Sequence, residues 1–294
     1  MIYQYDAAII GGDQRQIYLA CLLDKFGYKI ITFGLNINIP DCSVSTANSF
    51  EQAMSSSKTV ITPIPFSRDK TYITTNDNSC NGNILSVETF LANLQPEHFL
   101  IGGNIPNEVT EFCSRKTIPY FDLMKNDNIS MLNAISTAEG AIAHAIYKSN
   151  INLHHSNVLV LGYGKCGKVL ASKLGALGAK VSVCARSKIA LTEAYTNGFE
   201  RLEFDMLKSE IKNYNYIFNT IPAIILNDEL LSNISSETTI IDIASSPGGV
   251  DYKAAKEFNI NAHSCLGIPG KISPKSSAEI LAENILPILK ERND

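Results

Sequence analysis

A glycine-rich turn in the second half of the chain constrains the fold more than any other feature. The run VLVLG (158–162) predicts a strand, Gly162-x-Gly164-x-x-Gly167 predicts a tight turn, and the run KVLASKLGALG that follows predicts a helix. In such a unit the first glycine permits the turn, the second lets the backbone approach a pyrophosphate, and the third lets the helix pack on the strand. The N-terminus of the helix also presents N–H groups and the positive end of its dipole to phosphates. The sequence therefore predicts a dinucleotide-binding β-α-β unit.

The alternation of strand-like and helix-like segments predicts the fold class. Short runs rich in β-branched residues alternate with amphipathic segments along the chain, and continuous apolar strands of this kind are typical of buried parallel sheets. We expect a two-domain α/β dehydrogenase fold, with a C-terminal Rossmann-type doubly wound parallel sheet and an N-terminal flavodoxin- or Rossmann-like α/β domain. The expected parts are a substrate-side domain (1–128), an interdomain helix and linker (129–152), a Rossmann domain (153–273) and a C-terminal helix (274–294) that returns to the first domain.

Composition limits the possible partners and the compartment. The 294 residues are 45% hydrophobic and 18% charged, and the net charge of -4 argues against a broad basic surface for nucleic acid or anionic lipid. We expect no membrane-spanning helix, because no apolar run approaches about 20 residues. The first residues, MIYQYDAAIIGGD, predict a strand and lack the features of a signal peptide. Seven scattered cysteines without a C-x-x-C pair predict reduced thiols in the cytoplasm, with no disulfide and no metal site.

The end of the second strand of the β-α-β unit predicts which dinucleotide binds. Sites for NAD usually have an acidic residue there, which binds the ribose hydroxyls, whereas KVSVCARSK (180–188) offers Arg186 and Ser187. Arg186 can form a forked, charge-assisted pair with a 2′-phosphate and stack on adenine, Ser187 and nearby N–H groups can complete the site, and Lys188 can add charge. The alternative is an exposed arginine after a strand. We expect NADP.

Two later strands end in small residues and proline, in the sequences NTIP (219–222) and DIASSPGG (242–249). Ligands of open α/β sheets lie at these strand ends, where bulky side chains would block the nicotinamide half. Each turn alone fits ordinary turn chemistry, and it is their repetition that indicates a ligand site. The predicted cofactor-binding residues are Gly162, Tyr163, Gly164, Lys165, Cys166, Gly167, Ala185, Arg186, Ser187, Thr220, Ile221, Pro222, Ala244 and Ser245.

The N-terminal run IIGGDQRQ (9–16) predicts a second β-turn-α unit that lacks the third glycine. The residues from Gly11 to Arg15 bring backbone amides, Asp13 and a guanidinium to a helix start, a setting suited to a carboxylate. A capped helix with a surface arginine fits the same sequence equally well. We interpret this unit as a substrate-side site.

The run STAEGAI (136–142) lies within a segment, 129–149, that predicts a helix between the domains. Thr137, Glu139 and Gly140 open an apolar helix that we expect to line an interdomain cleft. Glu139 is either a first-turn carboxylate at the positive helix end or a group that faces substrate. No set of residues resembles a nucleophile triad.

Seven motifs occur in order from near the start of the chain to its last helix: GGDQRQ, STAEGAI, LVLGYGKCG, CARS, NTIP, DIASSPGG and GIPGKISPKSSAEILAENI. Together they resemble the family of dipicolinate synthase A subunits. The resemblance implies a nicotinamide-dependent oxidation that yields dipicolinate (pyridine-2,6-dicarboxylate) from the dihydrodipicolinate branch of lysine synthesis, in the cytoplasm of the mother cell of a sporulating bacterium. It also implies a hetero-oligomer, in which the partner is a smaller, flavoprotein-like B subunit.

The implied substrate is a small dicarboxylate whose ring is one two-electron oxidation from an aromatic pyridine, so that positioning can supply much of the rate. The predicted substrate-binding residues are Asp13, Arg15, Thr137, Lys271 and Lys275, of which both lysines flank Pro274 at the start of the last helix. Glu139 is the candidate for orientation or proton transfer. The sequence leaves open whether dihydrodipicolinate or its hydroxylated precursor is the substrate.

Two further functions remain open from the sequence. The run GIPGKISPKSSAEIL also resembles the proline-glycine loop and closing helix of methylenetetrahydrofolate dehydrogenases, so that another NADP-dependent dehydrogenase of that type or of the shikimate type is one alternative. The other is a non-catalytic, dinucleotide-bound scaffold for a flavoprotein partner.

Overall fold

The computed structural model describes residues 3–76 and 85–293. It divides the chain into two compact units, of which unit 1 is Met1–Ser130 with Ser273–Asp294 and unit 2 is Met131–Ile272. The first boundary between them falls inside the long helix α5 (Asp127–Lys148).

Unit 1 is built on a parallel sheet with the strand order β3-β2-β1-β4-β5-β6. The strands are β1 (Ala7–Ile10), β2 (Ile30–Phe33), β3 (Ser45–Thr46), β4 (Thr59–Ile61), β5 (Phe99–Gly102) and β6 (Tyr120–Asp122). The order reverses between β1 and β4, where Ala8 of β1 pairs with Ile31 on one side and with Val60 on the other. This reversal is the topological switch point of a doubly wound sheet.

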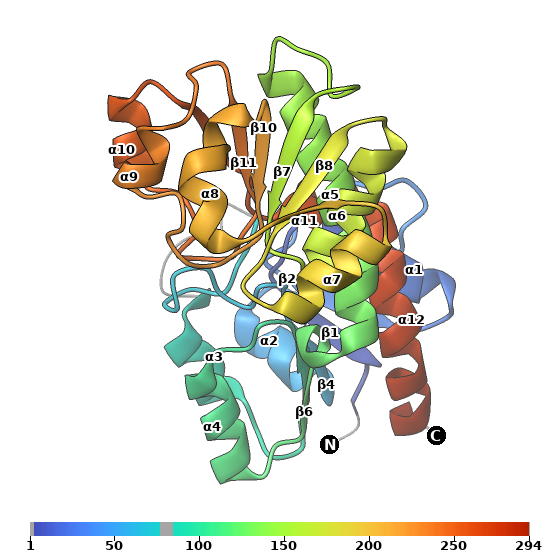
Figure 1. Ribbon diagram of the computed structural model, residues 1–294. Helices are drawn as coiled ribbons and strands as arrows, with labels where there is room; N and C mark the ends of the chain where they lie inside the picture. Colours follow the sequence, from blue (N-terminus) through green and yellow to red (C-terminus); the bar gives the residue numbers. More distant parts are fainter. Residues whose placement is uncertain (1–2, 77–84, 294) are drawn as a thin grey trace. The chain divides into compact units, whose positions relative to one another are not determined.

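The helices of unit 1 are α1 (Gln14–Lys25), α2 (Phe50–Ser55), α3 (Val87–Asn93), α4 (Asn107–Lys116), the 3₁₀ turn η3 (Leu123–Lys125) and α12 (Pro274–Asn293). The last helix of the chain, α12, packs beside α1 (Figure 1). Its Leu281 and Ile285 share a buried apolar cluster with Ile17 and Leu23 of α1. The C-terminal helix is therefore part of the core of unit 1.

A disulfide between Cys21 of α1 and Cys42 links the loop after β2 to this helix. The prediction of reduced cysteines without a disulfide was wrong for this pair. The fold brings their Cα atoms to 5.2 Å, although they are 21 residues apart in the sequence. The free cysteines of the described residues are Cys113, Cys166, Cys184 and Cys265, and Cys80 lies outside the described residues.

Unit 2 is a second parallel sheet, with the order β12-β11-β10-β7-β8-β9. Its strands are β7 (Asn157–Leu161), β8 (Lys180–Cys184), β9 (Glu200–Leu202), β10 (Tyr216–Asn219), β11 (Thr239–Asp242) and β12 (Asn261–Ser264). Counted along the chain, this is the strand order of the Rossmann fold. The switch point lies between β7 and β10, whose last residues, Leu161 and Asn219, pair in register. The predicted α/β fold class is confirmed.

The remaining helices are α6 (Lys165–Ala176), α7 (Lys188–Thr196), α8 (Phe204–Glu210), η4 (Ile211–Asn213), α9 (Asp228–Leu231), α10 (Tyr252–Glu257) and α11 (Ile268–Ile272). No described helix has both the length and the apolar composition needed to cross a membrane.

Local sequence patterns did not predict the short helices and strands. The polar stretch after β2 contains β3 and α2, and α11 was not predicted. The Ser/Thr/Asn-rich segment after β4 has isolated bridges such as Ser67 with Ile73, and residues 77–84 lie outside the described residues.

Candidate functional site

The three glycines after β7 meet different surroundings. Gly162 has a φ of +94°, and a Cβ there would lie 2.4 Å from Oγ1 of Thr220. A Cβ on Gly167 would lie 2.3 Å from the carbonyl oxygen of Gly162, so helix α6 approaches the turn too closely for any side chain. A Cβ on Gly164 would meet no atom within 4 Å. The first and third glycines are required by the packing of the protein itself, whereas the second leaves space above the turn.

The turn leaves several backbone N–H groups without a protein acceptor. The N–H of Gly162 donates to the carbonyl oxygen of Cys184 at 2.8 Å, and that of Lys168 donates to Gly164 at 2.9 Å. Between these two, the N–H groups of four residues find no acceptor in the described part of the chain: Tyr163, Gly164, Cys166 and Gly167. They lie at the N-terminus of a 12-residue helix whose N-cap glycine has no side chain to offer. Such a terminus has the geometry and the partial positive charge to bind phosphate oxygens.

Side chains around the turn have separate roles. The ring of Tyr163 is buried, its hydroxyl accepts a hydrogen bond from Nδ2 of Asn197 at 3.2 Å, and it stacks edge-on against Phe199. Tyr163 can therefore offer a ligand only its backbone. Burial raises the pKa of the Cys166 thiol, which keeps this group neutral beside an anion. Lys165, the first residue of α6, is exposed and adds positive charge.

The segment between β8 and α7 contains the predicted residues for the 2′-phosphate. Ala185 is buried, and Arg186 is exposed with no hydrogen bond or ion pair to any residue that the structure describes. Ser187 is the N-cap of α7, and its Oγ accepts from the N–H of Ala190 at 3.3 Å, which leaves its own hydroxyl hydrogen available. Glu193, the next carboxylate along the chain, is paired with Lys168 at 2.7 Å.

The end of β10 lies between the end of β7, where the glycine turn begins, and the end of β11. Thr220 is tied to the turn, since its backbone N–H and its Oγ1 both donate to the carbonyl oxygen of Leu161 at 2.9 Å. Ile221 and Pro222 follow in the same loop, and Ala244 and Ser245 follow β11. The structure thus gathers the predicted cofactor-binding residues at one edge of the sheet of unit 2.

Sequence reasoning missed a polar cluster beneath these loops. Asn219 and Asp242 are 0% and 1% exposed, and Nδ2 of Asn219 donates to Oδ1 of Asp242 at 2.8 Å. The hydroxyl of Tyr252 donates to the same carboxylate at 3.2 Å. The sequence did contain a signal for this cluster: two successive apolar strands each end in a polar residue. Such residues come to lie side by side when the two strands are adjacent and parallel, as β10 and β11 are.

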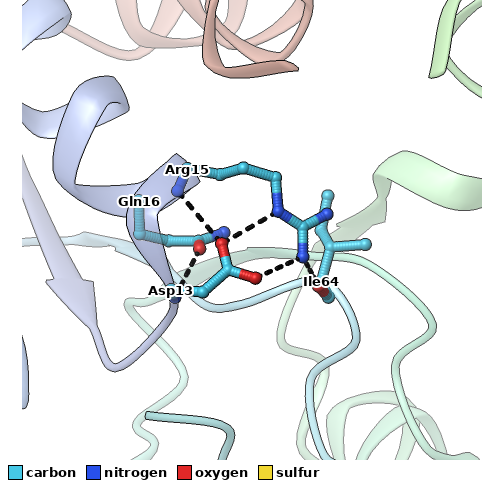
Figure 2. Close-up of polar contacts among 4 residues, drawn as sticks. All are labelled: Asp13, Arg15, Gln16 and Ile64. Atoms are coloured by element: carbon cyan, nitrogen blue, oxygen red, sulfur yellow. Dashed lines mark hydrogen bonds and ion pairs between the residues drawn. The ribbon is translucent and has the colours of Figure 1, made fainter. Parts of the chain in front are cut away.

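The corresponding turn of unit 1 is occupied by a pair of its own charged residues (Figure 2). Nε of Arg15 donates to Oδ1 of Asp13 at 2.9 Å, and Nη2 donates to Oδ2 at 2.7 Å and to the carbonyl oxygen of Ile64. The side chain of Arg15 is 4% exposed and that of Asp13 is 18% exposed. Asp13 also caps α1, since Oδ1 accepts from the N–H of Arg15, and Gln16 completes a capping box. The helix is capped, as one alternative predicted, but the arginine is buried rather than on the surface.

The backbone amides of this turn are also used within unit 1. The N–H of Gly11 donates to Phe33 and that of Gly12 donates to Thr74, both at 2.7 Å. The N–H of Asp13 donates to Oε1 of Gln16 at 3.0 Å. These amides, which we expected to be available to a carboxylate, already have acceptors.

The residues predicted around Glu139 lie elsewhere on their helix than expected. Helix α5 begins at Asp127, so that Glu139 is in its interior and not in its first turn. Its carboxylate pairs with Nζ of Lys173 at 2.8 Å in an exposed contact. Oγ1 of Thr137 donates to the backbone of its own helix, and a Cβ on Gly140 would lie 2.1 Å from Ile268. Gly140 therefore serves the close packing of α5 on α11.

The two predicted lysines do not share one helix. Lys271 lies in α11 of unit 2 and Lys275 in the first turn of α12 in unit 1, and both are exposed. The expectation that both lysines lie at the start of the last helix was wrong for Lys271, because a separate short helix precedes Pro274.

Two sheets with the same doubly wound order, one of them carrying a G-x-G-x-x-G turn at its switch point, define a two-unit protein of the Rossmann type with a dehydrogenase-like fold. The described residues contain no group of three or more His, Cys, Asp or Glu that could hold a metal ion.

Comparison with known proteins identifies the family to which the chain belongs. Residues 6–124 match the family model of the N-terminal domain of the dipicolinate synthase A subunit. The A subunit of dipicolinate synthase from Bacillus subtilis is 32% identical over 97% of this chain and 95% of its own length. The crystal structure of the same subunit from Bacillus halodurans has a TM-score of 0.86 at 30% identity, covering 98% of this chain and 99% of that one. A transhydrogenase from Sinorhizobium meliloti shares the fold at 11% identity, with a TM-score of 0.66 over 96% of this chain and 92% of that one. The chain belongs to the family of dipicolinate synthase A subunits.

Proposed function

We propose that this chain catalyses the NADP-dependent oxidation of dihydrodipicolinate to dipicolinate, together with a B subunit, in the cytoplasm of the mother cell of a sporulating bacterium. Membership of the family supports the product, and the naming of its relatives as one subunit of a synthase supports a partner subunit. The observation that carries the dinucleotide is the set of N–H groups at the switch point of unit 2 that have no acceptor among the described residues.

The pyrophosphate of the coenzyme is proposed to lie over Gly164, where no protein atom would meet a Cβ within 4 Å. Its oxygens would accept hydrogen bonds from the backbone of 163–167 at the positive end of α6. In this sheet order the adenosine half extends toward β8, and the nicotinamide half extends toward β10 and β11. Small residues after both strands, such as Ala244, leave room for the nicotinamide ring.

Preference for NADP is proposed to come from the segment after β8. Arg186 is an exposed guanidinium without a described partner, and Ser187 and the first N–H groups of α7 lie beside it in the sequence. The next carboxylate along the chain, Glu193, is paired with Lys168, so the described part of this segment offers no unpaired carboxylate to bind the ribose hydroxyls or to repel a phosphate. A forked guanidinium–phosphate pair is stronger than an ordinary hydrogen bond.

The reaction removes a hydride and a proton from the ring, and aromatisation drives it forward. NADP supplies the hydride acceptor, and the protein must hold two carboxylates and orient the ring. Lys271 and Lys275 are proposed carboxylate ligands, since both are exposed cations without an ion pair among the described residues. Arg15 and Asp13 are proposed to shape the substrate side as a pair, and Thr137 and Glu139 are proposed to orient the substrate or accept the proton.

The function is tested by mixing the purified chain with dihydrodipicolinate and NADP⁺ and recording the absorbance of the pyridine product and of NADPH. The proposal expects both to form in equal amounts, with or without an increase when the B subunit is added. Product that forms without NADPH, and only when the B subunit is present, would show that the chain is a scaffold. Failure of the complete mixture to form product would contradict the proposed substrate.

Coenzyme choice is tested separately by Arg186→Asp. A hydrogen bond to a charged group contributes roughly 1.5–3 kcal/mol, so we expect the wild-type chain to prefer NADPH over NADH by about 10- to 100-fold. The variant should lose or reverse this preference. Lys180→Asp is the matched control, because it makes the same charge change at the opposite end of β8. Equal affinity of the wild-type chain for both dinucleotides would refute the assignment of Arg186.

A further inference from the structure

The carboxylate of Asp242 is buried at the edge of the sheet of unit 2 and is surrounded by hydrogen-bond donors. Oδ1 accepts from Nδ2 of Asn219 at 2.8 Å and from the N–H of Ala244 at 3.2 Å. Oδ2 accepts from the N–H of Gly249 at 2.9 Å and from the hydroxyl of Tyr252 at 3.2 Å. A buried carboxylate is costly unless its lone pairs are used, and here each oxygen has two donors.

Asn219 extends this network to the neighbouring loop. It is the last residue of β10 and pairs in register with Asp242, the last residue of β11. Its Nδ2 also donates to the carbonyl oxygen of Ile221 at 3.0 Å, and its Oδ1 accepts from the N–H of Ile221 at 3.2 Å. The loop after β10 and the loop after β11 are therefore fixed to one another through two buried side chains.

Gly249 shows how closely the second loop follows these side chains. A Cβ at this position would lie 1.9 Å from Nδ2 of Asn219, so no side chain fits there. The carbonyl oxygen of Gly249 accepts from the N–H groups of Ile225 at 3.1 Å and Leu226 at 2.9 Å. The backbone of the loop is thus held on both sides.

We propose that Asp242 is a positioning residue, which fixes the two loops that shape the nicotinamide half of the dinucleotide site. This inference rests on the proposed dinucleotide function. The two halves of a dinucleotide lie on opposite sides of the switch point of such a sheet. All hydrogen-bond donors to the carboxylate of Asp242 come from β10 and from the segment after β11, on the nicotinamide side. The network therefore acts directly on that half, since no donor to the carboxylate comes from β7, α6 or β8, which form the adenosine side.

Tyr252 supports the same role. Burial and the nearby charge of Asp242 raise the pKa of its phenol, so that the hydroxyl stays a donor to the carboxylate. The phenol thereby connects the start of α10 to the loop after β11.

Asp242→Asn tests the network with a side chain of almost the same shape. An amide has one acceptor oxygen and one donor nitrogen, so its nitrogen must face either the N–H of Ala244 with Nδ2 of Asn219, or the N–H of Gly249 with the hydroxyl of Tyr252. Both orientations place donor against donor, and neither backbone N–H can reverse its role. At least one loop must move.

The measurement compares two ligands by calorimetric titration: NADPH, and 2′,5′-ADP, which lacks the nicotinamide half. We expect Asp242→Asn to weaken NADPH binding by roughly tenfold or more, the loss of one or two charge-assisted contacts, and to change 2′,5′-ADP binding by less than about twofold. Asp205→Asn, which removes an exposed carboxylate of the same unit, should change neither. A merely structural role for Asp242 would weaken both ligands together.

Each result of these titrations either supports or contradicts the role proposed for Asp242. If the wild-type chain binds neither ligand, and binds neither NADH nor ADP-ribose, the proposed function fails and this inference with it. If the wild-type chain prefers NADH, the same comparison is made with NADH and ADP-ribose. If the wild-type chain binds and the variant loses both ligands equally or neither, the inference is overturned while the proposed function stands. Should Asp242→Asn not fold, Tyr252→Phe removes a single donor and must show the same selective loss, of about threefold.

Discussion

The buried pair of Asp13 and Arg15 makes an asymmetric prediction about stability. Asp13→Asn keeps a good N-cap residue at the start of α1, so it isolates the loss of the charge. The guanidinium of Arg15, 4% exposed, would remain buried with the carbonyl oxygen of Ile64 and one neutral acceptor. Removing one partner of a buried ion pair costs about 3–5 kcal/mol. Asp13 is 18% exposed, so water can partly replace it, and we expect the lower end, about 3 kcal/mol.

Removing the other partner should cost much less. Arg15→Met keeps a long side chain at this position and removes the buried positive charge. Asp13 still accepts a hydrogen bond from the backbone N–H of residue 15 and remains in contact with water. The cost should be about 1 kcal/mol, the value of the lost hydrogen bond to Ile64. The double variant should be more stable than Asp13→Asn alone, because no buried charge remains unpaired.

Hydrogen exchange of the α1 peptides, read by mass spectrometry, measures this local stability in the full chain. A loss of about 3 kcal/mol should speed their exchange by roughly 150-fold. Peptides from the sheet of unit 2 should be unchanged in the same samples and provide the internal control. The reasoning is refuted if Asp13→Asn exchanges no faster than Arg15→Met.

Three further predictions follow from single contacts. Gly164→Val should abolish NADPH binding in a titration and leave the unfolding midpoint unchanged, and normal NADPH binding by this variant would contradict the proposed site. Gly167→Ala should lower the unfolding midpoint, because its Cβ would lie 2.3 Å from a carbonyl oxygen. Cys21→Ser with Cys42→Ser should reduce the free energy of unfolding by about 3 kcal/mol, the loop entropy for a separation of 21 residues, and non-reducing denaturation of the wild-type chain should leave both cysteines unlabelled. Burial lowers the pKa of His98 from its usual 6.5, so its contribution to stability is complete above pH 6.5 and is lost as the pH falls from there through the lowered pKa. An unfolding series from pH 7 to 5 should show this loss in the wild-type chain, and the slope should be smaller in His98→Gln.

Much of the fold could be predicted because its information is local. The β-α-β unit at Gly162 is written in consecutive residues, and each long strand is a continuous apolar run, so both sheets and their parallel class follow from the pattern. The elements that were missed, β3, α2 and α11, are two, six and five residues long, too short for a period to be visible.

The part of the candidate site that consists of backbone groups could be predicted from the sequence. Glycines and strand ends could be read from the sequence, but the partners of charged side chains could not. Arg15 finds Ile64 across 49 residues, and Glu139 finds Lys173 across 34, so neither interaction leaves a local pattern. Asp242 differs, because three of its donors lie within ten residues and only Asn219 is distant; the polar residues that end β10 and β11 were the sign that the prediction did not use.

The two sheets show why topology alone does not identify a ligand site. Both have the same strand order, and both have a glycine turn leading to a helix at the switch point. In unit 1 the carbonyl oxygens of Phe33 and Thr74 accept from the turn, and Arg15 is neutralised by Asp13. In unit 2 the N–H of Gly162 makes the bond equivalent to that of Gly11, to Cys184, but the N–H groups of Tyr163, Gly164, Cys166 and Gly167 have no acceptor among the described residues. Because an unused N–H at a helix terminus attracts an anion and a used one does not, the hydrogen bonds, rather than the strand order, are the reason why we propose the phosphate site in unit 2.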